Sequence, residues 1–315
     1  MRSVIVYAGI LILSLGIAWL RWTAEPDKIG ENEVLIAQGS ADQIAQVSYF
    51  SQQMEVLIDV QKDDSGSYLW VTFTDKKNPD EPQNKEFKAG ENGDKLLRSL
   101  SPFIGIRKLN VDDSKLEELG LSDTQTSISI TRGENTRIFD VGAEAYGTKD
   151  YYIRDQKSSE IFLVDDRKLT PILKARTNLP DRSLWSQKPP QAVSAVITFE
   201  DQKLFLEHSN WQDKSNAKWI QRDGSESDTT QLETWLGKFF RLSSSRYQSE
   251  ADELDNLEKR FSIQLTWEDG QSQTLEIFQQ DKAWWARSEH TRRKVKVTGN
   301  TLSALYEDLP GVMTD

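Results

Sequence analysis

The chain has 315 residues, a length that suits one large domain or two domains of ordinary size. Charged residues make up 28% and aromatic residues 10%, which excludes a disordered or collagen-like chain. The net charge of −11 argues against a nucleic-acid binder, because phosphate contacts need clustered Lys and Arg. The lack of any Cys excludes disulfides, thiolate metal sites and cysteine nucleophiles.

An uncharged apolar run covers residues 4–20. Seventeen helical residues at about 1.5 Å each span roughly 26 Å, close to the thickness of a bilayer core. Trp19 and Trp22 follow, where amphipathic aromatic rings sit at a membrane interface. The run therefore predicts a transmembrane signal-anchor over residues 1–22, with everything after Arg21 exported.

A cleaved signal peptide is the rival interpretation, because Gly16 and Ala18 have the small-x-small spacing of a cleavage site. The apolar run is longer than the usual core of a signal peptide, about 7–15 residues, and this favours an uncleaved anchor. Gly9 and Gly16 are seven residues apart and share one helix face, which suits docking against another membrane helix.

The rest of the chain is predicted to be α+β. We expect two similar modules in tandem, residues 23–187 and 188–315, each an antiparallel sheet with a few helices. Their joint is expected within residues 178–191, where three prolines interrupt the periodicity.

The second module shows the clearer pattern. Its helix is predicted from apolar residues spaced i, i+3, i+4, i+7 and i+8, namely Leu232, Trp235, Leu236, Phe239 and Phe240. Strict alternation predicts a strand with its apolar face at Phe261, Ile263, Leu265 and Trp267. Asp269 and Gly270 then supply a hairpin turn.

The first module is expected to repeat this order of elements. Its helix is predicted to carry Leu96, Leu97, Leu100 and Phe103. Gly133 matches Gly270 as a turn, and the aromatic-rich residues 152–154 match residues 285–287. The alternative is that two unrelated α+β domains share a generic strand rhythm.

Candidate catalytic groups are few. Neither His208 nor His290 has the context of a known metal or triad motif. Paired carboxylates such as Asp165 and Asp166 lie in hydrophilic stretches and are interpreted as solvated surface. Because no P-loop or G-x-G-x-x-G run occurs either, we predict no catalytic residue, no metal, no cofactor and no nucleotide.

Two clusters suit partner binding. Arg292 and Arg293, close to two lysines, form the one basic cluster, which suits an acidic partner or anionic headgroups; a solvated strand end is the alternative. Trp284 and Trp285 are adjacent on a predicted strand and so face opposite sides. One of the two rings is therefore expected to be exposed for protein or sugar contacts.

The chain resembles the domain of unknown function 4340 family. The resemblance is carried by Val141 and Gly142, YYIR at 151–154, IFLV at 161–164, NLPDRSL at 178–184 and the strand at 193–199. It implies a bacterial protein with an N-terminal anchor and a repeated α+β extracytoplasmic region, often encoded beside gliding-type ABC transporter permeases. The second half departs from the family pattern at residues 284–287 and 292–294. The resemblance brings no catalytic residues.

The function expected from these observations is that of a non-catalytic, membrane-anchored accessory or scaffold subunit of an ABC-type transporter or envelope complex. Its location would be the bacterial inner membrane, single-pass, with the bulk of the chain periplasmic. Its partners would be the membrane and a permease or auxiliary subunit, and no nucleic acid. The alternatives are an envelope glycan-binding protein that uses exposed Trp, or a hydrolase with an unrecognised site.

Overall fold

The structure, a computed structural model, describes residues 33–78, 80–213, 215–222, 229–249, 252, 254 and 256–314. Of these residues, 45% lie in strands and 21% in helices. The protein is therefore mostly β, and the predicted α+β class was wrong. The strands of the described residues form three sheets, and every pairing between them is antiparallel.

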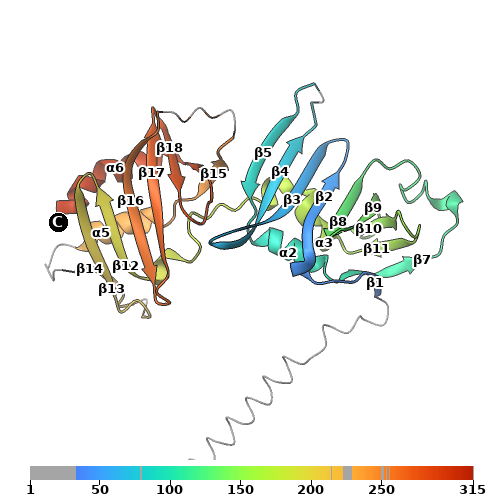
Figure 1. Ribbon diagram of the computed structural model, residues 1–315, viewed down its shortest axis with the longest axis horizontal. Coiled ribbons are helices and arrows are strands. Elements are labelled where there is room, and N and C mark those ends of the chain that lie inside the picture. The colour runs from blue at the N-terminus through green and yellow to red at the C-terminus, as the bar shows by residue number, and fades with distance from the viewer. Residues whose placement is uncertain are drawn as a thin grey trace, which may run out of the picture.

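The first large sheet has nine strands, seen in blue to green in Figure 1. Their order is β5 (Gln83–Lys88), β4 (Gly66–Asp75), β3 (Met54–Asp63), β2 (Ile44–Phe50), β8 (Ser127–Arg132), β9 (Asn135–Glu144), β10 (Tyr151–Asp155), β11 (Ile161–Val164) and β7 (Arg107–Leu109). A small two-stranded sheet beside it consists of β1 (Val34–Ala37) and β6 (Phe103–Gly105).

The second large sheet has eight strands. Their order is β14 (Lys218–Gln221), β13 (Gln202–Ser209), β12 (Ala192–Phe199), β16 (Glu258–Trp267), β17 (Ser272–Gln280), β18 (Ala283–Arg287), β19 (Val295–Val297) and β15 (Ser244–Tyr247). The two large sheets lie side by side, and a segment that we call the connection, residues 179–188, leads from the last helix of the first sheet into the second (Figure 1).

Short helices accompany each sheet. The first sheet has α2 (Glu91–Ser99), α3 (Asp166–Leu173), α4 (Ala175–Asn178), η1 (Ala41–Gln43) and η2 (Asp113–Lys115). The second has η3 (Pro189–Gln191), α5 (Thr229–Phe239) and α6 (Gly299–Thr314).

The two large sheets have corresponding strand orders. In each, three strands form a meander that ends in β4 or β14, a helix follows, and four strands form a second meander that begins at β8 or β16. In each, the far edge strand, β7 or β15, comes from the segment between the helix and the second meander. The first sheet carries β5 as an additional edge strand.

Several local predictions in the second sheet are confirmed. Four of the five predicted apolar positions, Leu232, Trp235, Leu236 and Phe239, are buried in α5, whereas Phe240 follows the end of the helix and is half-buried. The four alternating residues of β16 are buried as well, and Gly270 forms the turn to β17 with a φ of 77°. The apolar periodicity of the sequence predicted these elements correctly because one face of each packs against the core.

The predicted helix of the first module is shorter than expected. It ends at Ser99, and Phe103 begins β6, where its ring meets Phe139 edge-on at 5.5 Å. The apolar spacing of Phe103 relative to the helix therefore reflects a shared core and not a shared helix.

No helix of the described residues is long and apolar enough to cross a membrane. The predicted span, residues 4–20, lies outside the described residues, as do Gly9 and Gly16. The predicted transmembrane fold, the single-pass location in the inner membrane with a periplasmic bulk, and the membrane partner are corrected accordingly: nothing in the described structure supports them. The predicted boundaries after residues 22 and 187 stay predictions.

Candidate functional site

The basic cluster of the second sheet contacts the first sheet. It lies on the loop between β18 and β19. Arg293 forms an ion pair with Glu86 of β5, and its guanidinium lies 4.2 Å from the centre of the Trp70 ring on β4. Arg292 has its Nε 3.1 Å from the Asp63 carboxylate and its guanidinium 5.0 Å from the Tyr68 ring. The acidic groups that this cluster was predicted to bind in a partner are present in the same chain, and aromatic rings that the sequence did not predict lie beside them.

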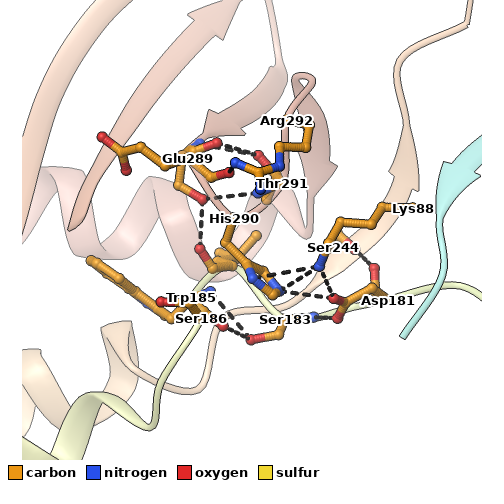
Figure 2. A network of polar contacts seen from close by, with 12 residues as sticks. Lys88, Asp181, Ser183, Trp185, Ser186, Ser244, Glu289, His290, Thr291 and Arg292 are labelled. Atoms are coloured by element: carbon orange, nitrogen blue, oxygen red, sulfur yellow. Dashed lines mark hydrogen bonds and ion pairs between the residues drawn. The ribbon is translucent and has the colours of Figure 1, made fainter. Parts of the chain in front are cut away.

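Beside this cluster, three ionisable side chains converge. The Lys88 Nζ lies 2.7 Å from the Asp181 Oδ2, and the His290 Nε2 lies 2.8 Å from the same oxygen. The Lys88 Nζ is also 3.2 Å and 3.5 Å from the two ring nitrogens of His290. Figure 2 shows the three side chains pointing toward one another from β5, the connection and the loop after β18. Their exposed fractions are 11%, 13% and 16%.

The Asp181 carboxylate is the acceptor that the other two side chains share. The His290 Nε2 donates to Asp181, and the Lys88 ammonium donates to the same oxygen. The Lys88 Nζ lies closer to Asp181 than to either ring nitrogen of His290, so the carboxylate is its main partner.

The connection between the sheets is held by its backbone. Pro180 bridges to Ala89, and the Asp181 amide donates to the Lys88 carbonyl at 2.9 Å. On the other side, the Tyr247 hydroxyl donates to the Asp181 carbonyl at 3.1 Å. The connecting segment thus runs between β5 and β15 as part of the packing and is not a free linker.

Aromatic packing continues the same contact. The rings of Trp70 on β4 and Tyr247 on β15 meet edge-on with their centres 5.9 Å apart. Trp185 of the connection packs against Trp267 of β16 at 6.3 Å. We call this whole contact the junction: Asp63, Tyr68, Trp70, Glu86, Lys88, Asp181, Trp185, Tyr247, His290, Arg292 and Arg293.

The charges of the junction change two pKa values. Burial alone raises the pKa of the Asp181 carboxyl, but the hydrogen bond from His290 and the charges of His290 and Lys88 outweigh it and lower the pKa to about 2. Burial raises the pKa of the Tyr247 hydroxyl, and the charge of Asp181 adds to the effect. Both groups therefore keep their hydrogen-bonding roles across the physiological range.

The pKa of Asp181 predicts an acid-sensitive junction. Since folding lowers the pKa from 3.8 to about 2, the ionised carboxylate stabilises the fold above about pH 4, and this stabilisation is lost as the pH falls toward 2. Its size is on the order of 2 to 3 kcal/mol. Urea unfolding of the wild type and of Asp181→Asn, compared between about pH 5 and pH 2, measures it. The free-energy difference between the two proteins should shrink with falling pH, and a constant difference would contradict the assignment.

The ion pair of Arg293 is expected to contribute less. Both partners are partly exposed, so Arg293→Ala should cost about 1 kcal/mol from the ion pair and the ring contact together. Part of this cost should vanish in high salt. Arg167→Ala is the matched control, because Arg167 pairs with Asp165 on α3 away from the junction. Equal losses in urea unfolding of the two variants would show that the junction adds nothing to an ordinary surface pair.

Trp284 and Trp285 do not lie on the surface. Their exposed fractions are 1% and 2%, so the prediction that one of them is exposed was wrong. The Trp284 Nε1 donates to the Ser303 hydroxyl of α6, and the guanidinium of Arg246 lies 5.1 Å from the Trp285 ring. Both faces of β18 are covered, which a single strand pattern does not reveal.

The other histidine is also engaged. The His208 Nδ1 lies 2.9 Å from the Ala192 carbonyl, and its ring stacks on Trp219 with centres 4.3 Å apart. No hydroxyl of a described Ser or Thr residue forms a hydrogen bond with either His208 or His290. The junction is thus arranged as a set of ion pairs that joins two sheets.

Sequence reasoning missed Lys88 and Glu86. Lys88 ends an edge strand in which Phe87 is the one apolar residue, and no local pattern sets Lys88 apart from the other polar residues of that strand. Asp181 does fall in the segment 178–184, which carries the family resemblance. Elsewhere, carboxylate oxygens of the half-buried Asp150, Asp165 and Asp166 come within 4.8 Å of one another; the pair Asp165 and Asp166 was interpreted as solvated surface.

These features define a mostly β protein in which two large antiparallel sheets are joined by a polar and aromatic junction. The chain belongs to the family described as domain of unknown function (DUF4340), whose family model matches residues 94–260. All the segments that carried the resemblance lie within this match. No curated protein and no solved structure matches the chain. The comparisons give no support to a transporter permease as partner, so that expectation is corrected and not retained.

Proposed function

We propose that the protein is a non-catalytic scaffold that acts by binding a protein partner across both large sheets. The observation that carries the proposal is the junction, in which His290, Arg292 and Arg293 of the loop after β18 each pair with an acidic group of the other sheet or of the connection. Such contacts fix the relative orientation of the two sheets. A fixed orientation lets the two sheets present one composite binding surface. It also reduces the entropy that is lost when a partner binds.

The test compares two variants of the full chain as baits. Cross-linked pull-downs from the native cells would use the wild type, the junction variant Asp181→Asn with Arg293→Ala, and the control Arg167→Ala. The proposal predicts that one defined protein is retained by the wild type and the control and is lost by the junction variant. Circular dichroism must show that the junction variant keeps its strands. Equal retention by all three baits, or substrate turnover by the purified chain, would overturn the proposal.

Glycan binding is a second candidate, favoured by one surface. Trp211, Phe205 and Ile220 line a depression of about 470 Å³ beside β12, β13 and β14. Phe205 is 46% exposed, and the Glu207 and Arg222 side chains supply an ion pair at the rim. Exposed rings flanked by polar groups suit sugar contacts. Retention of the wild type, but not of Trp211→Ala, on a polysaccharide column would favour this function over the scaffold.

A further inference from the structure

A separate cavity opens at one end of the first sheet. It has a volume of about 660 Å³, within the range typical of small-molecule sites. Its walls come from the turn between β2 and β3, the end of β4, the two residues before β8 and the α3–α4 corner. None of its lining residues belongs to the junction.

The lining is positively charged although the whole chain has a net charge of −11. Lys77, Lys174 and Arg176 line the cavity, against a single carboxylate, that of Asp75. Arg176 is engaged by Asp75 at 3.2 Å. Within the described structure, Lys77 and Lys174 form no ion pair, so two ammonium groups remain for a ligand.

The rest of the lining divides into an apolar floor and neutral polar groups. Phe73 is buried, and Met54 and Leu173 are half-buried beside it. Tyr49 is buried, and burial raises the pKa of its hydroxyl, which therefore keeps its proton. Thr126, which carries a hydroxyl, also lines the cavity. These neutral donors are suited to an anion and add no negative charge to repel it.

We infer that this cavity binds a small organic anion, with its carboxylate, sulfonate or phosphate head between Lys77 and Lys174 and its apolar body on Met54, Phe73 and Leu173. Charge-assisted hydrogen bonds from two ammonium groups hold the head. The floor removes apolar surface of the ligand from water. Lys77 and Lys174 lie far apart in sequence, so the fold itself brings these two charges to one cavity.

The experiment titrates the full chain with the dye anilinonaphthalene sulfonate, which has an anionic head and an apolar body. We expect a saturable rise in fluorescence that hexanoate reverses and hexylamine does not. The variant K77Q/K174Q should weaken dye affinity at least tenfold, because two charged contacts are lost. High salt should weaken the binding to the wild type and have little effect on the variant.

A matched control separates the site from general charge effects. K149Q/K157Q removes two exposed lysines elsewhere and changes the net charge by the same amount. It should bind the dye as the wild type does. Equal weakening in both variants, reversal by hexylamine as well as by hexanoate, or no saturable binding would each overturn the inference. Inorganic phosphate as a competitor tests whether an anionic group without an apolar body can bind at the two lysines. Displacement of the dye by millimolar phosphate supports this site for the anionic head, and enhancement of dye binding contradicts it.

Discussion

Replacing Trp235 with Ala is expected to lower the free energy of unfolding by about 3–5 kcal/mol, the range for truncating a large buried aromatic residue. The side chain is 2% exposed. Its ring stacks on Phe239 with centres 5.2 Å apart and tilts toward Phe261 of β16. Its Nε1 donates to the Leu305 carbonyl at 2.7 Å, which ties α5 to α6. The substitution therefore opens a cavity where two helices meet the second sheet.

Urea unfolding of the full chain, followed by circular dichroism, measures this loss. Trp211→Ala is the matched control, since Trp211 is half-buried on the depression beside β13 and holds no helix in place. It should cost about 1 kcal/mol or less. Similar losses in the two variants would mean that α5 does not contribute to the core as its contacts indicate.

The burial of Trp235 could be predicted from the sequence because helical periodicity is a local signal. Residues three and four positions apart must share a face, so burial of one predicts burial of the others. The same logic identified the inward face of β16. Trp284 and Trp285 show its limit: alternation places them on opposite faces, but only α6 and Arg246, distant in sequence, decide that both faces are covered.

The junction could not be predicted from the sequence, because its contacts join residues that are far apart along the chain. Lys88 lies 93 residues from Asp181 and 202 residues from His290, and no local pattern couples such positions. The basic pair Arg292 and Arg293 was recognised, but its partners were sought in another molecule. The sequence shows that a charge cluster exists, and the fold decides whether that cluster is satisfied within the chain.

Asp181→Asn is expected to cost about 3–5 kcal/mol, as large as the loss at Trp235. Asparagine preserves the shape of the side chain and can still accept from the Ser183 amide. It removes the negative charge, however, and leaves the Lys88 ammonium, which is 11% exposed, without a counter-charge. A buried charge that loses its partner is destabilising even where the intact pair contributes little.

The double variant Lys88→Met with Asp181→Asn distinguishes this cause from a general defect in packing. Removing both charges abolishes the uncompensated ammonium, while the Met side chain fills similar space, so the double variant should be more stable than Asp181→Asn alone. The two substitutions should therefore be strongly non-additive in a double-mutant cycle measured by urea unfolding at pH 7. If their costs simply add, the Lys88–Asp181 pair is not the interaction that joins the sheets. Non-additivity would instead identify Asp181 as the charge on which the contact between β5, the connection and the loop after β18 depends. Its carboxylate is the acceptor shared by Lys88 of the first sheet and His290 of the second.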